Sequence, residues 1–323
     1  MDLALRPLTT ESIPAWHELL VAIEDVDRTG EHYSQEDLAE ELANPDIEVG
    51  KDVVGAYDGA RLVGYFAVLP RGESEGHFTI HVEGAVRPDR RGEGVGTTLV
   101  AAMLRRAEEA QVQKGHGLPG RLMAKGMSAD TAQQTLLAGV GLLPSRWTVV
   151  MRAVLADVPP PAPVPDGYRI RAYDPSMAPA MLAAHNRAFV DHPEFTPWTE
   201  TMWKQWVTQS RAFRPGVTYV VTQDGSDDLV AYVQSNEYDA YLEATGRREA
   251  WVAKVGTLRE HRGRGLAGAL LQHCLAAYRE AGYDEAGLDV DSDNPTGALG
   301  VYERAGFEVQ CRFTNYTLLT PGG

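Results

Sequence analysis

The sequence predicts a mixed α/β protein that contains the same order of strands and helices twice. Three observations support this. A stretch with five prolines in nine residues, 157–165, divides the 323 residues into segments of similar length. Each segment repeats one succession of strand and helix patterns, and each places a basic, glycine-rich loop before a long amphipathic helix. We expect an N-terminal domain over 1–156, a linker over 157–165 and a C-terminal domain over 166–323.

The strand patterns of the two halves correspond. Apolar and β-branched runs predict an opening strand, a hairpin and a third strand in each half. In the first half these are 3–8, 53–57 with 62–69, and 79–86; in the second they are 168–171, 218–222 with 229–236, and 250–255. A long helix follows in each half, and then a strand, a second helix and a final β segment. This order predicts a mixed sheet with helices on its faces, formed twice.

Composition excludes several classes of protein. There are 45 acidic and 30 basic side chains, a net charge of −15, which argues against nucleic acid and anionic membranes as partners. No apolar run is long enough to cross a bilayer, and the first residues do not resemble a signal peptide, so we expect a cytoplasmic protein. The two cysteines cannot form a disulfide framework, and no His/Cys spacing indicates a metal site.

The chemistry concentrates in the two glycine-rich loops. Their shared pattern is Arg-x-x-Gly-x-Gly/Ala, because arginine and glycine recur at the same spacing before each long helix. The residues are Arg91, Gly92, Gly94 and Gly96 in the first loop, and Arg262, Gly263, Arg264, Gly265, Leu266, Ala267 and Gly268 in the second. A helix N-terminus binds phosphate when glycines allow the oxygens to approach the backbone.

The residues of these loops allow other interpretations. The glycines could simply form tight turns beside a solvated arginine patch, but the duplication argues against that. Neither loop fits the P-loop nucleotide motif. Residues 263–268 match Gly-x-Gly-x-x-Gly, yet charged residues separate them from the preceding strand and too little chain follows to form a dinucleotide-binding half.

With this loop pattern the sequence resembles the GNAT superfamily of acyl-CoA-dependent N-acetyltransferases, once in each half. The resemblance implies acetyl-CoA as cofactor, a mixed, mostly antiparallel sheet, and a central strand pair that splays apart. It implies that Val255, Gly256 and Thr257 lie along the pantetheine arm. Asn294 would help to hold the cofactor, and Tyr302 would protonate the departing thiolate. The alternative for Tyr302 is an aromatic residue packed on an amphipathic helix.

The first half departs from this pattern. Aligning Gly141-Leu142 with Gly306-Phe307 places Leu137 at the position of Tyr302 and Ala129 at that of Asn294. Leucine cannot donate a proton, so we expect the N-terminal domain to be catalytically degenerate and the C-terminal domain to be catalytic.

A base must also deprotonate the attacking amine. Glu249, on the strand that enters the second loop, is the first candidate, and Glu237 is the second. Either could instead be a solvated carboxylate at a strand end.

The expected activity is acetyl transfer to a primary amine of a small molecule, such as an amino sugar, a cysteinyl conjugate or a secondary metabolite. The amine would attack directly in a ternary complex. Alternatives are a protein or peptide amine as acceptor, and a non-enzymatic acyl-CoA-binding sensor. We expect a monomer or a homodimer. The acceptor pocket is expected from 189–206 and 237–245, whose aromatic residues either line a cleft or only pack: Trp198, Trp203, Trp206, Tyr238 and Tyr241.

Overall fold

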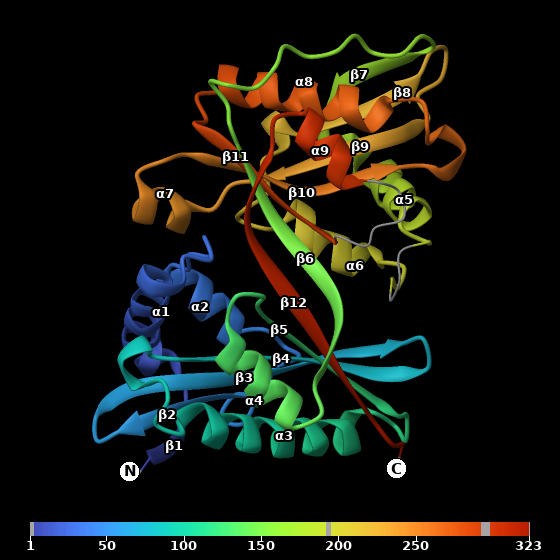
Figure 1. Ribbon diagram of the computed structural model, residues 1–323. Coiled ribbons are helices and arrows are strands. Elements are labelled where there is room, and N and C mark those ends of the chain that lie inside the picture. Colours follow the sequence, from blue (N-terminus) through green and yellow to red (C-terminus); the bar gives the residue numbers. More distant parts are fainter. Residues whose placement is uncertain (1–2, 192–194, 292–297, 323) are drawn as a thin grey trace. The chain divides into compact units, whose positions relative to one another are not determined.

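The computed structural model describes residues 3–191, 195–291 and 298–322 (Figure 1). These residues form two compact units. Unit 1 comprises Met1–Trp147 with Arg312–Gly323, and unit 2 comprises Thr148–Cys311. The mixed α/β class predicted from the sequence is confirmed.

Unit 1 holds the sheet order β1-β2-β3-β4-β5-β12. All neighbours are antiparallel except β4 and β5, which are parallel. The helix α3 packs on β3 and β4. The elements are β1 (Leu3–Pro7), α1 (Ile13–Asp27), α2 (Gln35–Leu42), β2 (Val53–Asp58), β3 (Arg61–Ser74), β4 (His77–Val86), α3 (Val95–Lys114), β5 (Gly120–Met127), α4 (Thr131–Gly139) and β12 (Glu308–Thr320).

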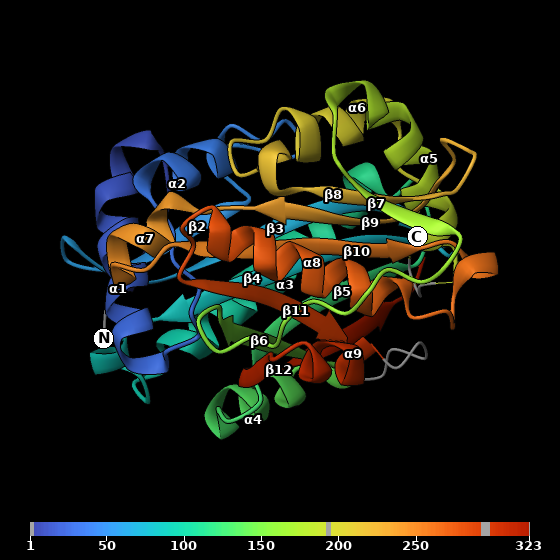
Figure 2. The same ribbon diagram turned by 90° about the horizontal axis from the view of Figure 1, so that it is seen from above.

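Unit 2 repeats this plan with the order β6-β11-β10-β9-β8-β7, in which β10 and β11 form the parallel pair. The helix α5 packs on β9 and β10, and α8 packs on β8 to β11 from the opposite face (Figures 1 and 2). The elements are β6 (Leu143–Val154), β7 (Tyr168–Ala172), α5 (Ala178–Ala188), α6 (Glu200–Trp203), β8 (Tyr219–Gln223), β9 (Leu229–Asn236), α7 (Asp239–Thr245), β10 (Glu249–Thr257), α8 (Leu266–Glu280), β11 (Glu285–Asp291) and α9 (Ala298–Arg304).

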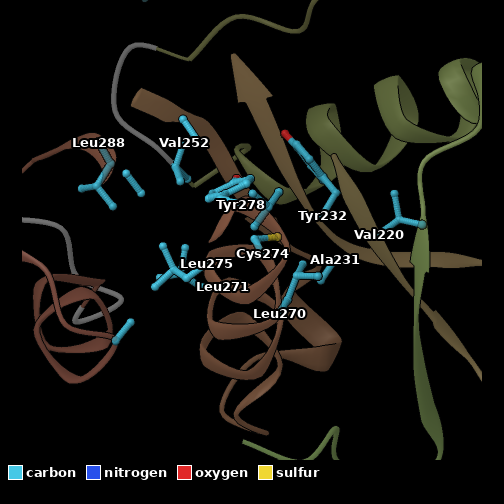
Figure 3. Close-up of a cluster of buried hydrophobic side chains, with 14 of the residues drawn as sticks. Val220, Ala231, Tyr232, Val252, Leu270, Leu271, Cys274, Leu275, Tyr278 and Leu288 are labelled. Atoms are coloured by element: carbon cyan, nitrogen blue, oxygen red, sulfur yellow. The ribbon is translucent and has the colours of Figure 1, made fainter. Parts of the chain in front are cut away.

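The core of unit 2 lies between the sheet and α8. Leu271, Cys274 and Tyr278 of this helix are buried against Val252 of β10 and Leu288 of β11 (Figure 3). The face of α8 predicted from its apolar spacing is therefore the one that packs on the sheet. Cys274 and Cys311 are not joined in a disulfide.

The units of the structure differ from the division expected at 157–165. β6 continues past Trp147 and hydrogen-bonds to β11 from Thr148 to Val154, whereas the last strand, β12, hydrogen-bonds to β5 in unit 1. The proline-rich stretch packs on unit 2. Val158 is buried there, and the amide of Ala162 donates to Gln272 over 2.9 Å. Hydrogen-bonded ladders and packing, rather than the prolines, decide which unit each segment joins.

Candidate active site

The strand pair β10 and β11 splays apart. The two strands pair only from Glu249 to Trp251, opposite Glu285 to Gly287. Beyond this point β10 continues to Thr257 and β11 to Asp291 without pairing to each other. The edges that face each other therefore keep backbone donors and acceptors that a ligand can use. β4 and β5 separate in the same way after Val82 and Ala124.

A glycine-rich loop connects β10 to α8. Gly263 and Gly265 have φ angles of +74° and +81°, a conformation that L residues rarely adopt, and a Cβ on either would meet no protein atom within 4 Å. α8 begins at Leu266, so the first-turn amides of Leu266, Ala267 and Gly268 have no partner within the helix. Amides that are unpaired at a helix start can bind a phosphate group.

The arginines of this loop have different roles. Arg262 donates to the carbonyls of Thr257 and Ala188 over 3.1 and 2.6 Å, and to Asp191 over 2.9 Å. Its guanidinium therefore fastens the loop to the end of α5, although the sequence predicted a cofactor contact. Arg264 is exposed and donates to the backbone carbonyl of Glu260 over 3.3 Å.

The first loop has the same backbone but a different charge balance. Gly92 and Gly94 have φ angles of +77° and +84°. Arg91 forms two hydrogen bonds of 2.7 Å with Asp27, much as Arg262 pairs with Asp191 in the second loop. The charges differ two residues further on, where Glu93 pairs with Arg90 and the second loop has the exposed Arg264. Gly96 serves packing, since a Cβ there would lie 3.1 Å from Leu136 of α4.

Tyr302 lies on α9, partly buried against the core of unit 2, with its ring 6.1 Å from that of Phe307. Burial and the nearby charge of Asp289 raise the pKa of Tyr302 to about 12, so the phenol keeps its proton at neutral pH. Its counterpart in unit 1, Leu137, is a buried side chain of α4. Asn294 lies outside the described residues.

Arginines hold both predicted base candidates. Burial opposes ionisation of Glu237, but hydrogen bonds from Arg248, Arg214 and Tyr283 prevail and lower its pKa to about 2. Glu249 is 5% exposed and accepts a hydrogen bond from Arg152 over 2.7 Å. Burial nevertheless raises the pKa of Glu249, which is the direction that a base at neutral pH requires.

The segment predicted to line the pantetheine arm is constrained by packing. A Cβ on Gly256 would lie 2.4 Å from the ring of Tyr232 on β9, so only glycine fits. The hydroxyl of Thr257 is buried without a partner among the described residues. Val255 packs against the core of unit 2, and so does the side chain of Leu266. A ligand can therefore meet Leu266 only through its backbone.

Sequence reasoning missed three groups near the splayed strands. Asp289 is an exposed carboxylate on β11, two residues beyond the last residue paired with β10. It acts electrostatically on both Tyr302 and Lys254. Lys254 lies on β10, and the buried His185 lies on α5. Asp289 and Lys254 are found only once the end of the paired segment is known.

The predicted aromatic residues separate into two groups. Trp198, Trp203 and Trp206 cluster, with ring centroids 6.0 Å and 5.0 Å apart for the pairs formed by Trp198. The hydroxyl of Tyr241 instead donates to Glu285 over 2.6 Å, and Tyr238, the residue before α7, is exposed. Within 3–191, 195–291 and 298–322, no helix could span a membrane and no group of three His, Cys, Asp or Glu side chains could hold a metal ion.

A splayed parallel strand pair, a glycine-rich loop and a helix N-terminus define the class of acyl-CoA-dependent transferases. The acetyltransferase (GNAT) family model matches residues 14–117 and 179–307, and the chain belongs to this family. The resemblance is therefore confirmed for both halves, and the protein is an acyltransferase. Members of the family use acetyl-CoA.

Relatives share the whole tandem arrangement. The chain is 34% identical to a mycothiol acetyltransferase of Thermobispora bispora over 78% of each chain, and 30% identical to that of Nocardia farcinica over 93% of this chain and 92% of the relative. The structure of a GCN5-related N-acetyltransferase from Sphaerobacter thermophilus superposes with a TM-score of 0.82 at 26% identity, covering 99% of this chain and 97% of the other. A tandem GNAT protein from the clavulanic acid biosynthesis pathway shares the fold, with a TM-score of 0.72 at 19% identity over the full length of both.

The sequence also resembles mycothiol synthase in residues 166–171, 186–189, 192–194 and 292–294, of which 192–194 and 292–294 lie outside the described residues. The comparisons confirm this resemblance in architecture.

Proposed function

We propose that unit 2 transfers an acetyl group from acetyl-CoA to a primary amine of a small molecule, by direct attack of the amine in a ternary complex. The observation that supports this most is the splayed β10–β11 pair, which ends beside the open glycine loop and α8. In this proposal unit 1 is catalytically degenerate, because Leu137 replaces the phenol and Glu93 stands where unit 2 has Arg264.

Residues of unit 2 would hold acetyl-CoA in a defined order. The first-turn amides of α8, with Arg264, would bind the diphosphate, and the free edge of β10 at Val255 to Thr257 would pair with the pantetheine arm. Asn294 is proposed to assist there. When bound, acetyl-CoA supplies the activated acetyl group as a thioester.

Proton transfers would fall to Tyr302 and a carboxylate. The phenol of Tyr302, which keeps its proton at neutral pH, would donate it to the departing sulfur. Glu249 is proposed to accept the proton of the amine, because burial raises its pKa; its exposure makes Asp289 the alternative. Glu237 is a weaker candidate, since its lowered pKa makes it a poor base at neutral pH.

The proposal is tested by measuring thiol release from acetyl-CoA with a panel of small amines and a panel of peptides. Release that depends on a small amine supports it. Release only with peptides would make a protein or peptide amine the acceptor. Stoichiometric binding of acetyl-CoA without release with any amine would instead indicate a sensor.

A further inference from the structure

Four polar side-chain groups on the α5 side of unit 2 lack a partner. His185 Nε2, Trp203 Nε1 and Gln234 Oε1 are buried without a hydrogen-bond partner among the described residues. The ammonium of Lys254, in the same part of the chain, forms no ion pair with a described residue, although the charge of Asp289 acts on it from a greater distance. A buried donor or acceptor without a hydrogen bond destabilises the folded protein. Several unpaired polar groups close together indicate that a bound ligand supplies their hydrogen-bond partners.

These groups are contiguous. The His185 ring lies 4.5 Å from that of Trp198 and 5.5 Å from that of Trp203, between centroids. Lys254 Nζ lies 4.9 Å from the Trp198 ring centroid, and Gln234 is the cross-strand neighbour of Lys254. We call these five residues the α5-side cluster: His185, Trp198, Trp203, Gln234 and Lys254.

A β-bulge directs Lys254 into the cluster. Along β10, Val252 pairs with Ser235 and Lys254 pairs with Gln234, so Ala253 is an extra residue. Under simple alternation Lys254 would share the face of Val252, which packs toward α8 (Figure 3). The bulge instead turns the ammonium toward Trp198 and α5. A cation placed beside a tryptophan face is favourable. Asp289 acts on this ammonium only from beyond ion-pair distance, so a closer anion would stabilise it further.

His185 presents a donor to the cluster. Its Nδ1 lies 2.6 Å from the hydroxyl of Tyr232, which has no other partner. Burial and the charge of Lys254 lower the pKa of His185 to about 3, so the ring is neutral. If the phenol donates to Nδ1, only one donor, Nε2–H, remains unmet; the other tautomer would also leave the phenol proton unmet. The first arrangement is therefore favoured.

Unit 1 reverses the charge at the equivalent position. Glu83 precedes Arg91 by eight residues, as Lys254 precedes Arg262. Glu83 accepts a hydrogen bond from Tyr65 over 3.3 Å. The same point of the fold thus carries a carboxylate in one half and an ammonium in the other. A residue that served only to hold the splayed strands would not need to change its charge in this way.

We propose that the α5-side cluster binds a carboxylate of the amine acceptor, with Lys254 and the donors of His185 and Trp203 facing the anion and Gln234 Oε1 accepting from an N–H of the same molecule. The acceptors would then be amino acids or conjugates with a free carboxylate. This inference rests on the proposed acetyl transfer and specifies its substrate class.

The test compares amino acids with their primary carboxamides, which lack the charge. We expect Lys254→Met to lower kcat/KM for the free acids by about tenfold to a hundredfold while the carboxamides change less than about twofold, because a charge-assisted contact is lost only with the acids. Lys254→Arg should restore most of the preference. Lys204→Met, at an exposed lysine outside the cluster, is the matched control, and thermal melting verifies folding of each variant.

Equal losses for acids and carboxamides in Lys254→Met, or no loss, would overturn the inference while leaving acetyl transfer intact. A Lys254→Met defect confined to acyl-CoA donors with a terminal carboxylate, such as succinyl-CoA, would overturn it as well, because the anion would then be on the acyl chain. If no amine is acetylated, calorimetry of the amino acids on the acetyl-CoA-loaded protein decides. Binding that Lys254→Met abolishes supports the cluster, and absence of binding overturns it.

Discussion

The ring of Tyr232 occupies the space that any side chain at position 256 would need. An ideal Cβ on Gly256 would lie 2.4 Å from Cε1 of Tyr232, whose ring is completely buried. His185 fixes the hydroxyl of the same tyrosine. The end of β10, which leads into the glycine-rich loop, therefore packs against an aromatic side chain that is held in place.

Gly256→Ala should therefore destabilise the protein. Overpacking of a filled core costs about 1–3 kcal/mol, and a shift of the β10 edge should also weaken acetyl-CoA binding. Chemical denaturation and calorimetry measure the two effects. Gly216→Ala is the matched control, because a Cβ at that glycine meets no atom within 4 Å. Equal stabilities of the two variants would show that the ring of Tyr232 can move to make room for a side chain at position 256.

Gly265→Val should abolish acetyl-CoA binding in unit 2. The variant fills the open space beside the first turn of α8 and strains a backbone with φ of +81°. Gly225→Val supplies the control for strain, since Gly225 has φ of +77°, open surroundings and a hairpin turn far from the loop in sequence. Binding measured by calorimetry should survive only in the Gly225 variant. If both variants bind alike, the loop does not hold the diphosphate.

Local patterns explain which parts of this structure could be predicted. The strands, the helices and the positive φ angles of the loop glycines follow from alternation, helical spacing and the conformational freedom of glycine, all of which are properties of neighbouring residues. The pairing of β6 with β11 and of β12 with β5 is a choice between distant partners. Both strands show similar patterns, so the sequence contained no local signal for it.

The candidate site also depends on contacts that neighbouring residues do not reveal. Lys254 points toward Trp198 only because Ala253 bulges, and a period of two cannot reveal a bulge. Glu249 was selected by alternation, but its partner Arg152 is 97 residues away in the chain. The charges that determine how a carboxylate titrates therefore come from residues that sequence spacing does not connect.

Glu237 should stabilise the fold above acidic pH. Its pKa is lowered from 4.5 to about 2 in the folded protein, so the stabilisation is present above pH 4.5 and is lost as the pH falls from about 4.5 to about 2. At about 1.4 kcal/mol for each pKa unit, this lowering corresponds to about 3 kcal/mol. Unfolding free energies of the wild type and Glu237→Gln, measured between pH 7 and pH 2, should converge at the acidic end. A constant difference across this range would contradict the assignment.

Tyr302→Phe should lower turnover by more than about tenfold with little change in the affinity for acetyl-CoA, because only the proton donor is removed while the ring remains packed against Phe307. Single-turnover thiol release and calorimetry separate the two quantities. Tyr316→Phe, at a buried tyrosine of unit 1, controls for the loss of a hydroxyl. An unchanged rate in Tyr302→Phe would remove this residue as the acid.

Glu249→Gln should remove the acidic limb of the pH profile of kcat/KM, since the variant has no carboxylate that must lose a proton before the amine is activated. A purely structural loss, caused by leaving Arg152 without its partner, would lower the rate by the same factor at every pH and lower the melting temperature. Asp289→Asn is the parallel variant, and it should keep the limb. If instead only Asp289→Asn flattens the profile, the base is the exposed carboxylate of β11, and Glu249 serves to anchor Arg152 beneath the strands.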